Sequence, residues 1–104
     1  MIQANFLKSQ DFYTAFSIKG HAGYAQYGED IVCSAVTSSV MTVINGITEC
    51  AALPADVSVS DNEIVLNLAT RTQTAQYFLS ALKLQLEFIA EEYRGTIKIT
   101  VTEV

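Results

Sequence analysis

The sequence predicts a single α+β domain in which a mainly antiparallel five-stranded sheet has two helices packed on one face. Five short segments alternate apolar and polar residues with a period of two, which is typical of strands. Two longer segments carry apolar residues at steps of three and four, as helices do. Their order is ββαββαβ. Because half of the 104 residues are hydrophobic, residues 1–104 can form one core as a single domain without disulfides.

The first two alternating segments predict a β-hairpin followed by a loop. The alternating positions are Ile2, Ala4 and Phe6, and then Phe12, Thr14, Phe16 and Ile18, and all of them except Thr14 are apolar. Residues 8–11 are a short polar connection between them. From residue 20 to residue 29 the chain has three glycines and two tyrosines and follows neither period, so a flexible glycine-rich loop is expected there.

A long helix is expected to begin at Asp30, whose side chain can accept hydrogen bonds from the first-turn amides. Its apolar positions are Val32, Val36, Val40, Val43 and Ile47. Gly46 costs about 1 kcal/mol relative to alanine in a helix, so the helix weakens near it, and Pro54 prevents any continuation.

The second half of the chain repeats the pattern of hairpin and helix and adds a last strand. Alternating residues up to Val59 and again from Ile64 predict a second hairpin whose turn residues are Ser60, Asp61 and Asn62. Thr70 or Thr72 can cap the second helix, and Gly95 ends it. The last strand alternates at Ile97, Ile99 and Val101.

The second helix has apolar residues on two sides. Its main stripe is Ala75, Phe78, Leu79, Leu82, Leu86, Ile89 and Tyr93, and a further set is Tyr77, Ala81, Leu84 and Phe88. A helix of this kind is either wholly buried or also faces a partner. In so small a domain we expect the second set to form a homodimer contact.

The charge balance argues against a nucleic-acid ligand. Eleven acidic residues against six basic ones give a formal net charge of −5, the wrong sign for binding phosphates. An acidic surface serves solubility and also attracts basic proteins.

No run approaches the ~18 consecutive apolar residues of a membrane span, and the first residues do not have the pattern of a signal peptide. A cytoplasmic protein without a membrane partner is therefore expected.

Cys33 and Cys50 are too few for a disulfide scaffold and lack the spacing of a zinc or redox pair. If both lie on one helix they are roughly 25 Å apart, which excludes an internal disulfide. Both are expected to be free thiols, and Cys50 is interpreted as structural.

His21 and Cys33 stand at the two ends of the glycine-rich loop, where they can meet. A helix N-terminus and a neighbouring imidazolium both favour a thiolate, the form that attacks a carbonyl. First-turn amides could also form an oxyanion hole. Alternatively, Cys33 is a small buried hydrophobe and His21 a capping or surface residue. Tyr24 and Tyr27 are either loop anchors or a lid over an apolar substrate.

The segment GHAGYAQYGEDIVCSAVTSSV (residues 20–40) resembles the signature of the ribosomal-processing cysteine proteases (Prp). Two separated pieces, Gly20-His21-Ala22 and Asp30-Ile31-Val32-Cys33, stand at the interval expected for that family. The length and the order of elements resemble the family over the whole chain. The family commonly has alanine and serine where this chain has Ser34 and Thr37.

The resemblance implies a cysteine endopeptidase that removes the N-terminal extension of large-subunit ribosomal protein number twenty-seven during ribosome assembly, acting as a homodimer without metal or other cofactor. It implies Cys33 as nucleophile and His21 as general base and acid. Asp30 either caps the helix or orients His21, and Thr37 keeps a hydroxyl one turn from Cys33. Family substrates carry aromatic residues beside the cleaved bond, so an apolar pocket is expected. The implied substrate loop comprises Gly20, Gly23, Tyr24, Tyr27 and Gly28.

Other functions compete with proteolysis. The same thiol chemistry could serve a thioesterase or an acyltransferase. A non-catalytic dimeric module that captures an apolar peptide is an alternative from another class. A thiol phosphatase is disfavoured because its Cys-x5-Arg loop would need arginine where this chain has Ser39. Direct binding of ribosomal RNA has little support from the charge.

Overall fold

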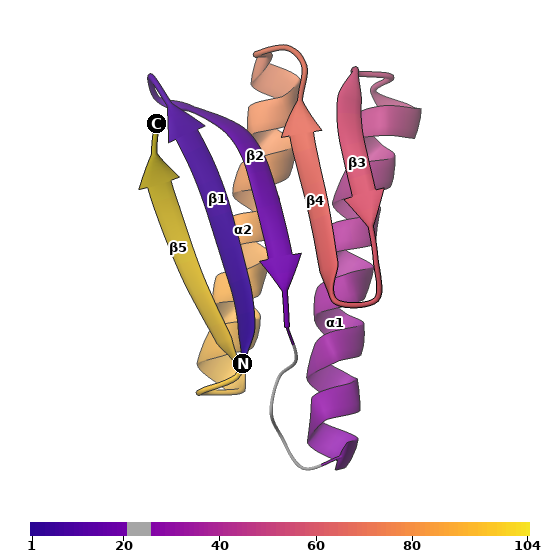
Figure 1. Cartoon of the computed structure of the whole chain (residues 1–104), viewed down its shortest axis with the longest axis vertical. Coiled ribbons are helices and arrows are strands. Elements are labelled where there is room, and N and C mark those ends of the chain that lie inside the picture. The colour runs from indigo at the N-terminus through magenta and orange to yellow at the C-terminus, as the bar shows by residue number, and fades with distance from the viewer. Residues whose placement is uncertain (21–25) are drawn as a thin grey trace.

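The strands and helices occur in the predicted order (Figure 1). The computed structural model describes residues 1–20 and 26–104, and the side chains of residues 1–20 and 31–104. The elements are β1 (Ile2–Ser9), β2 (Phe12–Lys19), α1 (Gln26–Asn45), a π-helical turn η1 (Gly46–Cys50), β3 (Ala55–Val59), β4 (Glu63–Leu68), α2 (Gln73–Glu92) and β5 (Ile97–Glu103).

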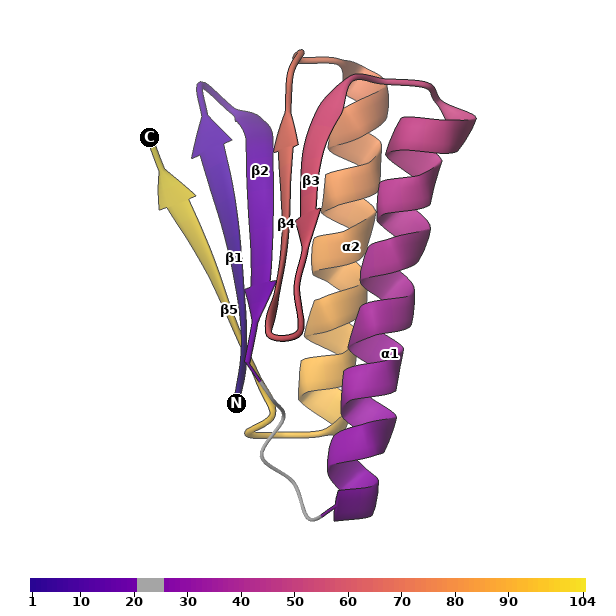
Figure 2. The ribbon, with the colours of Figure 1, turned by 45° about the vertical axis from the view of Figure 1, so that its right-hand side comes forward.

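The five strands form one sheet in the order β3-β4-β2-β1-β5. Neighbouring strands are antiparallel except β1 and β5, which are parallel. Both helices lie on the same side of the sheet (Figure 2). Alternate residues of β1 face this side and are buried, as are Val32, Val36 and Val40 on α1. The predicted α+β architecture is therefore confirmed.

The hairpin of β1 and β2 contains a bulge that the alternating pattern did not predict. Gln10 and Asp11 form a two-residue turn with positive φ angles of 51° and 69°. Leu7 pairs with Ala15 but Lys8 pairs with Tyr13, so Thr14 is the extra residue on β2. Because of the bulge, Tyr13 faces the side of the sheet that the alternating pattern assigned to Phe12 and Thr14. Tyr13 packs edge-on against Phe6, with the ring centroids 5.9 Å apart.

Gln76 of α2 is buried and binds the backbone beside this bulge. Its Oε1 accepts a hydrogen bond from the Tyr13 amide at 2.6 Å, and its Nε2 donates to the Tyr13 carbonyl oxygen at 2.9 Å. One side chain therefore satisfies both backbone groups of Tyr13 where the helix crosses the sheet.

Replacing Gln76 by leucine is expected to lower the free energy of unfolding by about 2–3 kcal/mol, because it leaves a backbone donor and acceptor unpaired. Urea unfolding followed by circular dichroism measures the change. Gln85→Leu, at an exposed position of the same helix, is the matched control. Equal stability of the two variants would contradict the role given to Gln76.

The first helix begins four residues earlier than expected, at Gln26 rather than Asp30. Gly28 therefore lies within α1, which a helix tolerates at a cost of about 1 kcal/mol.

At Gly46 the helix continues as η1, and a Cβ there would lie 2.4 Å from Cε1 of Phe78. Gly46 thus permits close contact between the first helical segment and α2.

Residues 31–50 are long and apolar enough to cross a membrane, with a mean hydropathy of 1.6, and 39% of that segment is buried inside the fold. Its apolar stripe, which includes Val32, Val36 and Val40, packs against the sheet, and these three residues are buried. The protein core therefore accounts for the buried part of this apolar segment.

Of the two predicted caps, Thr70 and Thr72, it is Thr72 that caps the N-terminus of α2. The Thr72 hydroxyl accepts a hydrogen bond from the Ala75 amide at 3.1 Å. The helix ends at Glu92, and Gly95 follows with a φ of +81°. Val59, Leu84 and other large apolar residues remain exposed outside the core.

Candidate active site

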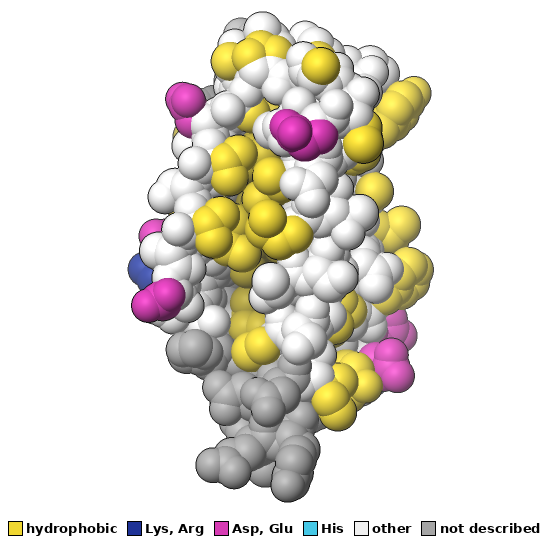
Figure 3. Space-filling view, turned by 90° about the vertical axis from the view of Figure 1, so that its right-hand side faces the viewer, with side chains coloured by type: hydrophobic (Ala, Val, Ile, Leu, Met, Phe, Trp, Pro, Cys, Tyr) yellow, Lys and Arg dark blue, Asp and Glu magenta, His cyan; other side chains and the backbone are white. Residues whose placement is uncertain are grey.

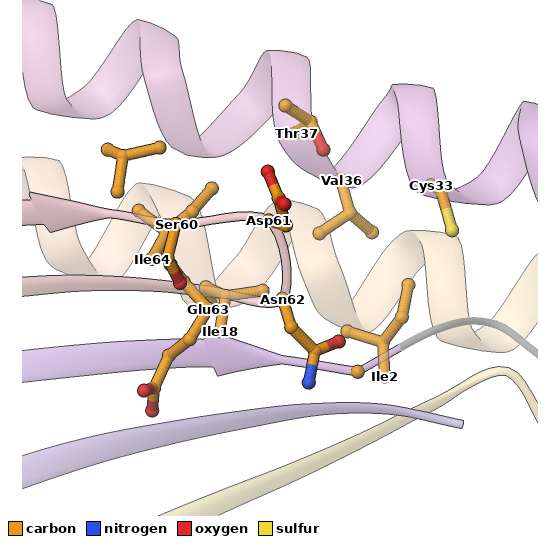
Figure 4. Close-up of a pocket in the computed structure, with 12 residues that line it drawn as sticks. Ile2, Ile18, Cys33, Val36, Thr37, Ser60, Asp61, Asn62, Glu63 and Ile64 are labelled. Carbon is orange, nitrogen blue, oxygen red and sulfur yellow. The ribbon is translucent and has the colours of Figure 1, made fainter.

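A cavity of about 280 Å³ lies between α1, the end of the sheet and the turn joining β3 to β4 (Figure 4). Cys33 lines it from α1, and its sulfur points toward the sheet. Apolar walls come from Ile2, Ile18, Val36, Val59 and Ile64. The thiol of Cys33 is half-buried and is a free cysteine, as predicted. It is thus accessible from an apolar cavity rather than sealed in the core.

The geometry of α1 explains why Cys33 faces this cavity. Val32, Val36 and Val40 form the buried row that packs against the sheet. Cys33 follows Val32 by one helical step, so it stands at the border between that row and the exposed side. The same periodicity that builds the core therefore places the thiol at the rim.

Gly20 fixes the point where the chain leaves β2. Its φ is +94°, and a Cβ there would lie 2.8 Å from the Met1 carbonyl oxygen, so only glycine fits without strain. Its amide donates a hydrogen bond to the Asn62 carbonyl oxygen at 3.1 Å. Gly20 lines the same cavity as Cys33. The residue directly before His21 in the sequence is therefore held at the wall of this cavity.

The remaining residues predicted for the loop fall outside what the structure describes. His21, Gly23 and Tyr24 lie in the undescribed segment, and Tyr27 and Asp30 lie on α1 without described side chains. Gly28 also lies on α1 rather than in a loop. The structure thus brings together Gly20, Cys33 and Thr37, and their relation to His21 stays a prediction.

The helix boundary corrects two expectations about α1. Asp30 stands four residues after Gln26, inside the helix, and so it does not cap it. Cys33 stands seven residues after Gln26, beyond the first turn, where a helical amide already has an acceptor within the helix. First-turn amides of α1 therefore do not surround Cys33 as an oxyanion hole. The glycine-rich composition before Asp30 concealed the first turn of the helix.

Thr37 lies one turn beyond Cys33 and lines the cavity with it. Ser39, Thr42 and Thr48 each donate a hydrogen bond to the carbonyl oxygen four residues back on the helix. Within the part of the chain that the structure describes, the Thr37 hydroxyl has no such partner and is available to a ligand. Ser34 is exposed and does not line the cavity.

The turn from Ser60 to Glu63 forms a wall that sequence reasoning did not associate with the site. Asp61 and Glu63 both line the cavity, so its polar rim carries acidic residues. No motif marks this turn, because it is about thirty residues from Cys33 in the sequence. Only the pairing of β4 with β2 brings it to the cavity.

Comparison with known proteins identifies the family to which this arrangement belongs. A family model described as cysteine protease Prp matches residues 1–98. The chain belongs to this family. It is 31% identical over 103 residues to the ribosomal processing cysteine protease Prp of Mycoplasma genitalium, covering 95% of this chain and 94% of that protein. It is 28% identical over 108 residues to Prp of Bacillus subtilis, with 96% of each covered.

A solved Prp structure shows the same fold. The crystal structure of Staphylococcus aureus Prp, in complex with a covalently linked product peptide, matches with a TM-score of 0.84 at 24% identity. The match covers 98% of this chain and all of that one. The family model and the curated relatives, rather than this structure, confirm the resemblance stated from residues 20–40.

Proposed function

We propose that the protein is a cysteine endopeptidase that removes the N-terminal extension of large-subunit ribosomal protein number twenty-seven. The observation that carries the proposal is the cavity shared by Cys33 and Gly20, the residue directly before His21. A half-buried thiol that lines an apolar cavity, in a chain of the Prp family, suits a nucleophile better than a packing residue. The proposed site of action is the cytoplasm.

In the proposed mechanism Cys33 and His21 work as a pair. The Cys33 sulfur attacks the scissile carbonyl carbon, and His21 holds the proton that the thiol has released. The bond from carbon to nitrogen breaks as His21 donates that proton to the leaving amine. His21 then takes a proton from water, whose oxygen attacks the thioester and releases Cys33. Thr37, which lines the cavity, is proposed to donate a hydrogen bond to the bound peptide, and Asp30 is proposed to orient His21.

The walls of the cavity support a peptide with apolar side chains beside the cleaved bond. Ile2, Ile18, Val36 and Ile64 form an apolar lining, and its volume is near the lower end of ligand pockets, about 300 Å³. This suits one or two side chains of an extended peptide. Tyr24, with Gly23 as a hinge, is proposed to close over it.

The charges support a basic client. Asp61 and Glu63 line the cavity, and the whole chain carries a formal charge of −5. Ribosomal proteins are basic because they bind RNA, so an acidic enzyme attracts them at long range. Salt should therefore weaken the encounter with the full-length substrate.

The test is cleavage of the extended ribosomal protein from the same organism, with the masses of both products measured. We expect a single cut within the N-terminal extension, and a thioester between the peptide and Cys33 after rapid acid quenching. Binding of the extension without any cut would overturn the proposal in favour of a peptide-capturing module. Cleavage without an adduct on Cys33 would contradict the assigned nucleophile.

We further propose that the enzyme acts as a homodimer through the outer side of α2. Tyr77, Leu84 and Phe88 on this side are each more than half exposed, although all three are large and apolar. Contiguous exposed apolar residues on one helix face are typical of an interface.

Replacing Phe88 by glutamate is expected to shift the protein to a monomer, with a dissociation constant raised at least tenfold, because a charge would be buried against apolar side chains. Light scattering over a concentration series measures the mass. Phe88→Leu, which stays apolar, should remain a dimer. A wild-type protein that is monomeric throughout the series would contradict the interface.

A further inference from the structure

Strand β3 forms one edge of the sheet and is open along its outer side. The sheet order places it next to β4 alone among the described strands. Four of its five residues are exposed. An open edge presents unpaired backbone groups on which an extended chain can add as another strand.

The register identifies which backbone groups of β3 point outward. The Ser60 amide donates to the Glu63 carbonyl oxygen at 2.9 Å, and the Ala69 amide donates to the Pro54 carbonyl oxygen at 3.1 Å. Hydrogen-bonded pairs alternate along an antiparallel ladder, so Asp56 and Ser58 bond to β4. The amides and carbonyls of Ala55, Val57 and Val59 therefore face the open edge.

The side chains of β3 lead along the same edge into the cavity. Val57 pairs with buried Leu66, and Val59 pairs with Ile64, so both valines lie on the side of the sheet that carries the helices. They are nevertheless 39% and 58% exposed. Val59 lines the cavity that contains Cys33. Figure 3 faces this edge of the molecule and shows hydrophobic side chains gathered in a band down its middle.

We propose that the substrate peptide binds as an additional strand along β3, with its backbone hydrogen-bonded to Val57 and Val59. The inference rests on the proposed function and adds how the peptide is held. The occupant is an extended peptide because the edge is continuous with the cavity of Cys33, which receives the scissile bond. A related enzyme, S. aureus Prp, holds a covalently linked product peptide. Alternate apolar side chains of the peptide would cover Val57 and Val59.

The opposite edge of the sheet provides a matched control. On β5, the Ile2 amide donates to the Thr96 carbonyl oxygen at 2.8 Å, and the Val104 amide donates to the Lys8 carbonyl oxygen at 2.9 Å. Alternation along this parallel ladder leaves the Val101 amide facing outward. The exposed fraction of Val101, 41%, is similar to the 39% of Val57. Val101 does not line the cavity.

The experiment compares Val57→Pro with Val101→Pro. Each change removes one outward amide without removing a ladder hydrogen bond, which an edge strand tolerates. We expect kcat/KM for a peptide carrying the ribosomal-protein extension to fall about tenfold or more in Val57→Pro, since a hydrogen bond and close approach are lost. Val101→Pro should stay within about twofold of wild type, and Cys33 should react equally fast with iodoacetamide in wild type and both proline variants.

Two outcomes separate this inference from the proposed function. If wild type cleaves the peptide and Val57→Pro cleaves it as fast as Val101→Pro, binding along β3 is overturned while the protease assignment stands. If wild type does not cleave it, the protease assignment fails.

A second measurement does not depend on the proline variant folding. In Cys33→Ala saturated with the peptide, the outward amides of Val57 and Val59 should exchange hydrogen at least tenfold more slowly than without peptide. The amides of Ser58 and Val101 should be unchanged. Unaltered exchange at Val57, or failure of the peptide to bind, counts against the inference.

Discussion

Cys33→Ala is expected to abolish cleavage, with kcat/KM lowered about 10⁴-fold or more, as when other enzymes lose their nucleophile. Cys33 is the thiol that lines the cavity in the described part of the chain. Its side chain is half-buried, so removing the sulfur leaves little empty volume and the fold should persist. Product masses from the extended ribosomal protein, followed over hours, measure the loss.

Cys50→Ala is the matched control for this variant. Cys50 is an exposed free thiol at the end of η1 and does not line the cavity. Its replacement should leave kcat/KM within about twofold of wild type, as surface substitutions usually do. Comparable loss in both variants would point to damaged folding, and full activity of Cys33→Ala would show that another group attacks the peptide bond.

His21→Ala is expected to lower kcat by about 10²–10⁴-fold, the usual contribution of a general acid and base. Gly20, to which His21 is joined, lines the cavity of Cys33 and is fixed there by its bond to Asn62. His21 is the single histidine of the chain, so no second imidazole can replace it. Single-turnover kinetics with the extension peptide measure the chemical step.

Alkylation by iodoacetamide gives an independent measurement of the same pair. On exposure alone Cys50 should react faster, since Cys33 is half-buried. Faster alkylation of Cys33 at neutral pH therefore indicates activation by His21, and it should disappear in His21→Ala while Cys50 keeps its rate. Equal behaviour of Cys33 in both proteins would contradict the proposed pairing and favour a non-catalytic module.

Periodicity predicts the fold well because most of the core follows local rules. Ile2, Ala4 and Phe6 alternate in the sequence and are buried on one face of β1. Thr72 was one of two predicted caps, and its hydroxyl has the expected partner. Val32, Val36 and Val40 likewise follow the predicted helical period and are buried on α1.

The features that local rules missed depend on contacts between distant segments. The bulge at Thr14 is stabilised by Gln76 from α2, which no alternating pattern reveals. The turn that bears Asp61 enters the cavity through strand pairing. The sequence did not reveal that α1 begins at Gln26, because Gly28 lies in a glycine-rich segment and glycine-rich segments are usually assigned to loops.

The parallel pairing of β1 with β5 makes the cavity depend on synthesis of nearly the whole chain. Ile2 lines the cavity, and its register partner is Ile97. The two residues are far apart in the sequence, so this contact cannot form before β5 has been synthesised. A nascent chain that lacks β5 leaves β1 unpaired on that side. Proteolytic activity is therefore expected to arise only after β5 has left the ribosome.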